Sequence, residues 1–262
     1  MTTEDIVQYY TSQYREDERL DRRPQARLEW TRTLEVLHEL LPPGAFVLDV
    51  GGGTGAYARE LTRAGHRVRL VDLVPAHVEQ ARAGDPPIEA SVGDARELPF
   101  ADGSFDAVLV LGPLYHLHER ADRVAVLREA ARVTRPGGVL AAAVIARFAG
   151  PLDFAATGRF DARALDEARS LVHDGRNDPE LGFTHAYFHR PEELLSECTD
   201  AGLPGAVLHG VEGPLWTAAE AALDGPHAAS VFTAALELAR LYSTERSLVA
   251  ASSHMLATAV RG

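Results

Sequence analysis

The residues best suited to chemistry are a glycine-rich run and the acid just before it. Asp49 stands in the short apolar run Val-Leu-Asp-Val, and Gly51, Gly52 and Gly53 follow at once. Glycine has no Cβ atom, so the backbone can turn sharply there and a ligand can approach it closely. A helix after such a turn offers free N–H groups and its positive dipole end to a negative ligand group. The spacing therefore predicts a nucleotide-type pocket at the end of a strand.

Two further acids follow apolar segments in the same way. Asp72 ends the run Arg-Val-Arg-Leu-Val-Asp, and Asp94 stands in the sequence Gly-Asp-Ala-Arg. A third segment, Phe-Asp-Ala-Val-Leu-Val-Leu, ends at Leu111 and is followed by Gly112. Ligands of open parallel sheets bind beyond the carboxyl ends of the strands. We therefore expect these positions to meet along one edge of a sheet.

A second group of candidates follows this segment, in the sequence Gly-Pro-Leu-Tyr-His-Leu-His. We interpret His116 as a catalytic base or a substrate anchor, and Tyr115 as a wall of the pocket. The alternative for His116 is a structural histidine. These residue types are suited to proton transfer and hydrogen bonding.

Three polar aromatic residues alternate further along the chain. His185, Tyr187 and His189 fall on one face of an extended segment, where they form either a pocket rim or a set of structural contacts. Trp216, with Phe183, is a candidate wall of an aromatic substrate pocket. The chain has 11 histidines, but none stands at the tight spacing typical of a metal site, so we predict no metal.

The elements that must position these residues alternate between strand and helix. Strands are predicted at 47–50, 67–72, 88–92, 105–111 and 139–145, and helices at 25–41, 56–64, 75–83 and 120–133. The Arg-Pro-Gly-Gly sequence at 135–138 is interpreted as the turn that ends the last of these helices. This alternation predicts an open, mostly parallel, doubly wound sheet with helices on both faces.

The two ends of the chain and the region 147–184 have a weaker pattern. A short aromatic helix is predicted at 4–14, either packed on the domain or acting as a flap in which Tyr10, Tyr14 and Arg19 close over the ligand. Region 147–184 is irregular apart from a helix at 165–172, and is either a packed insertion or a lid. Helices at 191–201, 217–223 and 228–241 and strands at 205–210 and 254–260 complete the prediction.

Composition favours one globular domain. The chain has 262 residues, of which 46% are hydrophobic and 24% charged, and a net charge of −12. Such an acidic chain is a poor partner for nucleic acid or an anionic membrane. The single cysteine, Cys198, excludes an intrachain disulfide and fits a reducing compartment. With a polar start and no apolar run of membrane-spanning length, we expect a cytoplasmic protein.

Lysine is absent from the sequence, and every basic side chain is arginine. The protein therefore cannot form a lysine Schiff base or use a P-loop lysine or a Tyr-x-x-x-Lys pair. This absence argues against a short-chain dehydrogenase of similar size.

With these motifs in order, the sequence resembles the class I S-adenosylmethionine-dependent methyltransferases. The run at 47–55 is similar to the glycine motif Asp-x-Gly-x-Gly-x-Gly of that family, and Asp72 matches the acid that holds the ribose hydroxyls. Asp94 and Ala95 match the pair that binds adenine, and 105–111 and 135–138 resemble the fourth-strand motif and the turn before strand five. The likeness extends over about 45–146 and the terminal strand.

The resemblance implies a Rossmann-like, seven-stranded fold with N-terminal helices and a helical lid insertion. It implies a single domain with a helical cap at 1–44, a donor-binding core at 45–146, a substrate and lid region at 147–253 and a terminal strand at 254–262. The implied donor site has the following members: Asp49, Gly51, Gly52, Gly53, Asp72, Leu73, Asp94, Ala95, Leu111, Tyr10 and Arg19.

The implied activity is methyl transfer from S-adenosylmethionine to O or N of a small-molecule acceptor by in-line displacement. His116 is the candidate catalytic residue, and Tyr115, His185, Tyr187, His189 and Trp216 are the candidate acceptor contacts. We expect a monomer or homodimer without nucleic-acid or membrane partners. Two alternatives stay open: a relative that binds the nucleoside without transferring methyl, and a nicotinamide-dependent oxidoreductase.

Overall fold

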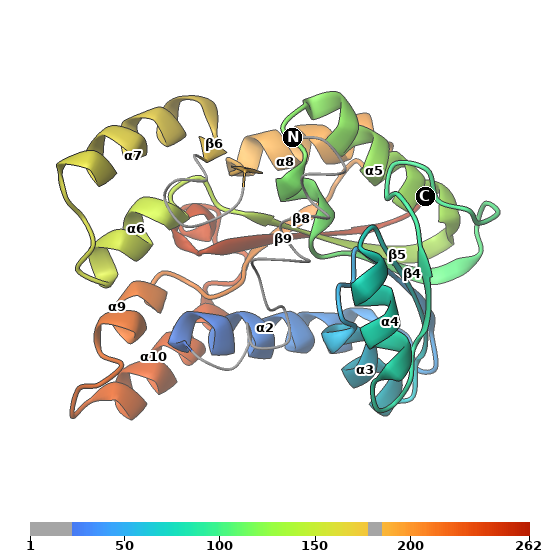
Figure 1. Ribbon diagram of the computed structural model, residues 1–262, viewed down its shortest axis with the longest axis horizontal. Coiled ribbons are helices and arrows are strands. Elements are labelled where there is room, and N and C mark those ends of the chain that lie inside the picture. Colours follow the sequence, from blue (N-terminus) through green and yellow to red (C-terminus); the bar gives the residue numbers. More distant parts are fainter. Residues whose placement is uncertain (1–22, 178–184) are drawn as a thin grey trace.

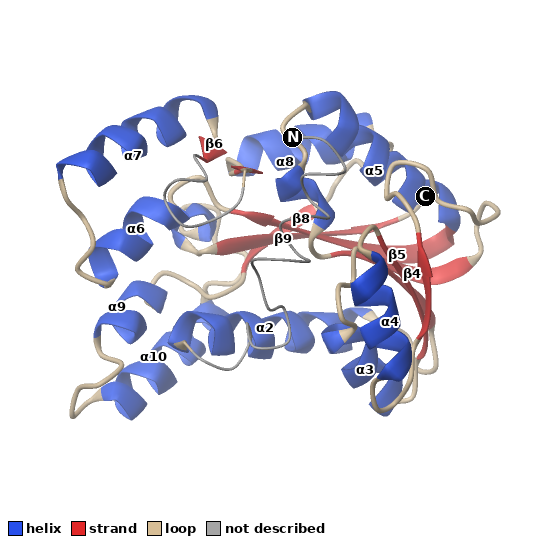
Figure 2. Cartoon of the chain, in the orientation of Figure 1, coloured by secondary structure: helices blue, strands red, loops and turns tan. Residues whose placement is uncertain are grey.

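The computed structural model of the protein describes residues 23–177 and 185–262. A seven-stranded sheet lies at its centre (Figures 1 and 2). The strand order is β3 (Glu89–Val92), β2 (Arg67–Asp72), β1 (Phe46–Val50), β4 (Phe105–Val110), β5 (Thr134–Ile145), β9 (His254–Val260) and β8 (Val207–Gly210). The first five are parallel, and β9 is antiparallel to both of its neighbours. The predicted mostly parallel, seven-stranded sheet is confirmed.

Helices cover both faces of the sheet. On one face lie α2 (Pro24–Leu40), α3 (Ala56–Arg63) and α4 (Pro75–Ala83), and on the other lie α5 (Arg120–Val133) and α8 (Pro191–Asp200) (Figure 1). Leu37, Leu61 and Val78 fill the first interface, whereas Leu127 and Leu194 fill the second. Because β1 and β4 are buried on both sides, their sequences are almost continuously apolar, as parallel sheets require. This two-sided cover holds the carboxyl ends of the strands at fixed positions.

The sequence predicted a separate turn at the Arg-Pro-Gly-Gly sequence, but this prediction is wrong. These residues form the irregular start of β5. That strand begins at Thr134, and its pairing with β4 shifts from Phe105↔Thr134 to Ala107↔Val139. A Cβ atom on Gly138 would lie 2.7 Å from the carbonyl oxygen of Asp106. Only glycine lets the two backbones approach this closely, so the extra residues form a bulge rather than ending the strand.

The region after β5 is more regular than the sequence predicted. It contains α6 (Ala149–Ala156), which the prediction missed, and α7 (Ala162–Asp174), which extends beyond the predicted 165–172. The Asp161 side chain caps α7 by accepting from the Ala164 backbone N–H at 2.8 Å. A two-stranded sheet of β6 (Arg176–Asn177) and β7 (Ala186–Tyr187) follows. That this region is a lid stays a prediction.

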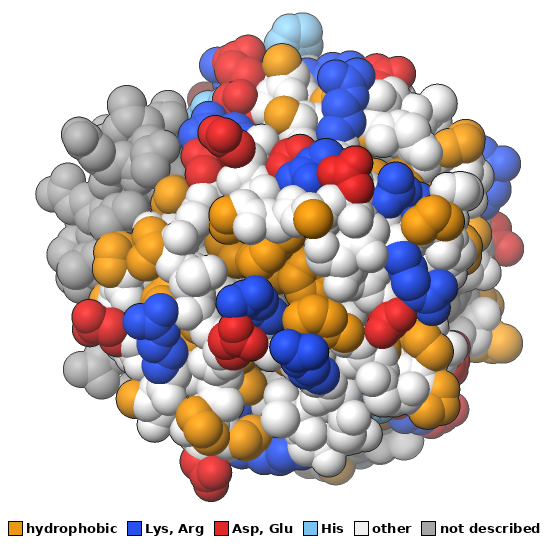
Figure 3. All heavy atoms as spheres, turned by 90° about the vertical axis from the view of Figure 1, so that its right-hand side faces the viewer, with side chains coloured by type: hydrophobic (Ala, Val, Ile, Leu, Met, Phe, Trp, Pro, Cys, Tyr) orange, Lys and Arg blue, Asp and Glu red, His pale blue; other side chains and the backbone are white. Residues whose placement is uncertain are grey.

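Two further helices, α9 (Trp216–Ala221) and α10 (Ala228–Leu241), pack beside α2, and short 3-10 turns form η2 (Pro113–His116) and η4 (Val249–Ala251). The predicted helix at 4–14, the candidates Tyr10, Tyr14 and Arg19, and Phe183 lie outside the described residues. In the parts of the chain that are described, no helix is long and apolar enough to cross a membrane. Figure 3 shows one face of the molecule, where acidic and arginine side chains are interspersed rather than gathered by sign.

Candidate functional site

The glycine-rich turn after β1 is tightly packed on both sides. Gly51, Gly53 and Gly55 have φ angles of +68°, +57° and +86°, which L side chains rarely adopt. A Cβ atom on Gly51 would lie 2.4 Å from Cγ of Pro113, and one on Gly52 would lie 2.5 Å from Oδ2 of Asp49. The absence of side chains therefore leaves bare backbone at the start of α3, where a ligand can lie against it.

Asp72 contacts the glycine-rich turn from the neighbouring strand β2. It is buried at the end of β2, where Oδ2 accepts from the Gly53 N–H at 2.9 Å and Oδ1 accepts from the Val74 N–H at 2.8 Å. The ring nitrogen Nδ1 of His77 lies 3.2 Å from Oδ1. A carboxylate has about four acceptor positions, so one that is fixed by these bonds can still accept from the hydroxyls of a ligand.

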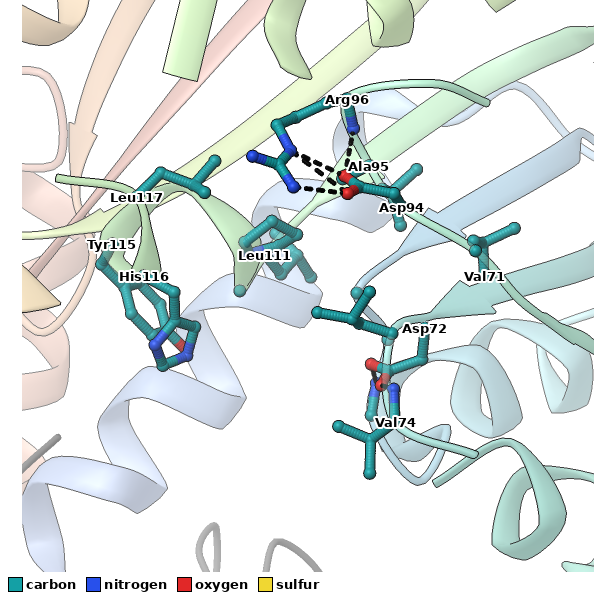
Figure 4. Close-up of a pocket in the computed structure, with 18 of the residues that line it drawn as sticks. Val71, Asp72, Val74, Asp94, Ala95, Arg96, Leu111, Tyr115, His116 and Leu117 are labelled. Carbon is teal, nitrogen blue, oxygen red and sulfur yellow. Dashed lines mark hydrogen bonds and ion pairs between the residues drawn. The ribbon is translucent and has the colours of Figure 1, made fainter. Parts of the chain in front are cut away.

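Asp94 lies at the end of β3 and is held by the arginine two residues later. Arg96 Nη2 lies 2.6 Å from Oδ2 and the Arg96 backbone N–H donates to Oδ1 at 2.9 Å, an arrangement visible in Figure 4. Hydrogen bonding from Arg96 lowers the pKa of Asp94 below its usual value. The carboxylate is thus ionised and oriented beside Ala95, and it can accept a hydrogen bond from a ligand amino group.

Asp49 lies behind the turn rather than in the cavity. It is 1% exposed, and neither carboxylate oxygen has a hydrogen-bond partner among the described residues. Burial, with a smaller contribution from the negative charge of Asp72, raises the pKa of Asp49 to about 7. Gly52 lies between this carboxylate and the cavity. Asp49 can therefore affect a ligand only by fixing the shape of the turn or by its electrostatic field.

His116 and Tyr115 lie across the cavity from Asp72, in η2 after β4 (Figure 4). His116 is buried, and burial lowers its pKa to about 4, so its imidazole is neutral at physiological pH. Tyr115 lies against His116, with ring centroids 4.6 Å apart. His118, at the end of the same segment, also has a lowered pKa because it is partly buried and close to Arg176.

A cavity of about 290 Å³ lies between these groups. The predicted residues that line it are Gly51, Gly52, Gly53, Asp72, Leu73, Asp94, Ala95, Leu111, Tyr115 and His116. It is also lined by residues that the sequence analysis did not select, among them Tyr57, His77, Arg96, His118 and Arg176. Tyr57 and His77 could have been found, because each is within the first turn of the helix that follows a predicted ligand-binding strand end.

The other acceptor candidates lie elsewhere. His185 is exposed, and its ring centroid is 6.1 Å from that of His118 at the cavity wall. Tyr187 and His189 pack against each other at 4.7 Å, and His189 is fully buried beside Glu197. Trp216 is 1% exposed in a core cluster, and its indole N–H donates to the Ala251 carbonyl at 3.0 Å. None of these four lines the cavity.

The fold and this cavity define a Rossmann-like α/β protein with a nucleoside-type site at the carboxyl edge of its parallel strands. Residues 48–142 match the family model described as a methyltransferase domain. A demethylmenaquinone methyltransferase of Beutenbergia cavernae is 41% identical over 42% of this chain and 43% of its own length. The demethylmenaquinone methyltransferase of Mycobacterium sp. strain KMS is 34% identical over 62% of this chain and 64% of its own length.

Solved structures agree on the fold. That of an S-adenosylmethionine-dependent methyltransferase from Mesorhizobium loti matches with a TM-score of 0.58 at 21% identity, over 89% of this chain and all of that one. Residues 48–142 therefore match a methyltransferase domain, and the chain has the fold of S-adenosylmethionine-dependent methyltransferases. The matches cover 43% and 64% of the length of these two curated relatives, less than two thirds in both cases.

Proposed function

We propose that the protein transfers the methyl group of S-adenosylmethionine to O or N of a small-molecule acceptor. The observation that carries this proposal is the convergence of three strand ends on one cavity: a bare glycine turn after β1, Asp72 after β2, and Asp94 with Ala95 after β3. S-adenosylmethionine has an amino-acid tail, a ribose with two hydroxyls and an adenine. These three parts fit a backbone cradle, a carboxylate acceptor and a second carboxylate beside a small residue.

Each group of the chain has a defined task in this proposal. Asp72, already fixed by Gly53 and Val74, accepts hydrogen bonds from the ribose hydroxyls. Asp94 accepts from the adenine amino group while Arg96 holds it in place. The turn at 51–53 receives the amino-acid tail, whose ammonium favours the ionised form of Asp49 behind Gly52. The donor supplies a methyl group activated by its sulfonium charge.

The acceptor side is formed by η2 and the wall around it. A sulfonium methyl group is intrinsically reactive, so alignment and the exclusion of water are the main contributions of the protein. His116 has a pKa of about 4, which makes it a weak base at neutral pH but a good neutral hydrogen-bond partner. We assign it as the anchor of the acceptor, with Tyr115 as the wall beside it.

Two measurements test the proposal in sequence. Titration calorimetry with S-adenosylhomocysteine should show one site per chain, and Asp72→Ala should weaken it by about 30-fold or more, from lost charge-assisted hydrogen bonds of about 2 kcal/mol. Transfer from methyl-labelled S-adenosylmethionine should then be followed over a panel of hydroxyl and amine acceptors. Demethylmenaquinone, a quinone without a hydroxyl or an amine, is tested separately as a carbon acceptor because the curated relatives carry that name.

The outcomes separate the alternatives. Binding of the donor without product on any acceptor would support a relative that only binds the nucleoside. Binding of a nicotinamide nucleotide in place of S-adenosylhomocysteine would support an oxidoreductase. Failure of both nucleotides, or an Asp72→Ala variant that binds S-adenosylhomocysteine as tightly as the natural chain, would contradict the proposal.

A further inference from the structure

A second cluster of chemically active side chains lies beyond the end of β5, outside the cavity already described. It consists of Gln25 and Glu29 on α2, Glu212 after β8 and His254 at the start of β9. One ligand atom each from Glu29, Glu212 and His254 lie within 4.8 Å of one another. The sequence analysis predicted no metal, because these residues are far apart along the chain and only the fold brings them together.

We propose that Glu29, Glu212 and His254, with the Gln25 amide as a fourth donor, bind one divalent transition-metal ion of the class of Mn²⁺, Fe²⁺ or Zn²⁺. Two carboxylates and one imidazole are a common donor set for such ions, whereas Mg²⁺ and Ca²⁺ prefer oxygen donors alone. With a neutral imidazole, the two carboxylates carry a charge of −2, which one divalent ion balances.

The donor atoms already face one point. Nδ1 of His254 lies 2.5 Å from Oε1 of Glu212 and 3.8 Å from Oε2 of Glu29. Gln25 stands one helical turn before Glu29, and its Nε2 lies 3.1 Å from Oε1 of Glu212 and 3.4 Å from Nδ1 of His254. A rotation of the amide by 180° would present the Gln25 oxygen instead of its nitrogen to the same point.

Glu212 is oriented for this role by groups outside the donor set. Its other oxygen, Oε2, accepts from the Ser252 hydroxyl at 2.7 Å and from the His254 backbone N–H at 2.8 Å. These two bonds leave Oε1 directed at the imidazole, as outer hydrogen bonds do for metal ligands.

The cluster lies within the fold, away from both described cavities. Glu212 is fully buried and Glu29 is 8% exposed, and none of the four residues lines the donor cavity or the smaller cavity beside Phe154. The bound ion would replace the direct contact between His254 and Glu212. It would join α2 to the last strand.

The test uses the full chain without an affinity tag, stripped with a chelator and reloaded with Mn²⁺ or Zn²⁺. Elemental analysis after desalting should give about one ion per chain, and calorimetry should show one binding site per chain. Glu212→Gln and His254→Ala should weaken binding by about 100-fold or more, since even outer-shell changes cost 10- to 100-fold. Glu29→Gln, which keeps the side-chain shape, should weaken it as well.

His209→Ala is the matched control. His209 lies on the adjacent strand β8, half-buried, and its ring bonds to Ser243 and Thr258 rather than to an acid. If only the cluster of Glu29, Glu212 and His254 binds the ion, the metal affinity of His209→Ala should stay within about threefold of that of the natural chain. Circular dichroism and S-adenosylhomocysteine binding report whether each variant is folded. If Glu212→Gln does not fold, the metal affinities of Glu29→Gln and His254→Ala show whether the cluster binds the ion.

Three results would overturn the proposal. The first is less than one fifth of an ion per reloaded natural chain, which would mean that the cluster holds only a proton. The second is equal affinity in the natural chain and in His254→Ala or Glu29→Gln, which would assign the ion to surface histidines. The third is a loss in His209→Ala as large as that in His254→Ala. None of these results depends on whether the protein transfers methyl groups.

Discussion

At the scale of single residues, the glycine turn contacts one well-bonded carboxylate and one that lacks hydrogen bonds. Asp72 accepts from two backbone N–H groups, whereas Asp49, one strand away, has no hydrogen-bond partner within the described residues. The charged form of a buried group without hydrogen bonds is unfavourable, so the pKa of Asp49 rises to about 7. Asp49 therefore lowers the stability of the fold whenever it ionises.

This argument predicts that Asp49→Asn stabilises the ligand-free protein at alkaline pH. A folded-state pKa raised from 3.8 to about 7 means that stability is lost as pH rises through 7. The isosteric amide cannot ionise, and the variant should gain about 1 to 4 kcal/mol at pH 8. Urea unfolding at pH 5 and pH 8 measures this, and the gain should shrink towards pH 5. A variant that is less stable than the natural chain at pH 8 contradicts it.

His116 predicts the opposite pH dependence. Its pKa falls from 6.5 in the unfolded chain to about 4 in the folded one, so stability is lost as pH falls from 6.5 towards 4. His116→Gln should remove up to about 3 kcal/mol of this acid sensitivity, measured by urea unfolding at pH 7 and 4.5.

If His116 anchors the acceptor, the same variant should also lower the rate of methyl transfer by about 10-fold or more. The dependence of that rate on pH between 6 and 9 should not change.

At the scale of elements, the positions of Asp72 and Asp94 at the cavity could be predicted because they depend on the local sequence. Asp72 ends β2, and Asp94 follows β3 by two residues. Parallel strands present their carboxyl ends at the same edge of the sheet, so position along the chain fixes position in space. Tyr187 and Trp216 could not be placed in this way. Their surroundings come from α5, α8 and η4, and no local pattern distinguishes a buried aromatic residue from one that lines a cavity.

The glycine turn gives a prediction with an internal control. Gly51 has a φ of +68° and would place a Cβ atom 2.4 Å from Pro113, whereas Gly65 has a φ of +93° and no atom within 4 Å of that position. Gly65→Ala should lose about 1 kcal/mol from backbone strain alone, and Gly51→Ala about 3 kcal/mol or more. Only Gly51→Ala should also weaken S-adenosylhomocysteine binding. Equal losses of stability in the two variants would show that the contact with Pro113 relaxes without cost.

The opposite face of the sheet is held by a buried ionic network. Arg123 on α5 donates to Oε1 of Glu197 on α8 at 2.9 and 2.7 Å, and His189 lies 3.2 Å from Oε2. Burial alone would raise the pKa of Glu197, but the bonds from His189 and Arg123 lower it. The arginine and the acid are 2% and 1% exposed, so neither charge is compensated by water.

Glu197→Gln should therefore cost about 3 kcal/mol, because it leaves the Arg123 charge buried and unpaired. Asp166→Asn is the control, since the Asp166–Arg169 pair is 76% and 70% exposed, and its loss should cost less than about 0.5 kcal/mol. Thermal and urea unfolding of both variants measure the difference. Similar small losses in both would mean that the network does not hold α5 to α8.

At the scale of the whole molecule, the charge distribution bears on the acceptor. The chain carries a net charge of −12, and acidic and basic side chains alternate over the face in Figure 3. The donor cavity itself is lined by both signs, including Asp72, Asp94, Arg96 and Arg176. A polyphosphate backbone needs a continuous basic surface, whereas a small acceptor needs only the local complement of one cavity.

We therefore expect the protein to methylate small molecules and to leave nucleic acids unmodified. Binding of transfer RNA or duplex DNA depends on phosphate neutralisation, and an acidic chain should not retain either at 50 mM salt. Incubation with methyl-labelled S-adenosylmethionine and a cell extract, followed by size fractionation, should place the label in low-mass material. Label that stays with RNA, is lost on ribonuclease treatment and falls with added salt would contradict the small-molecule assignment, because only phosphate contacts weaken so steeply with salt.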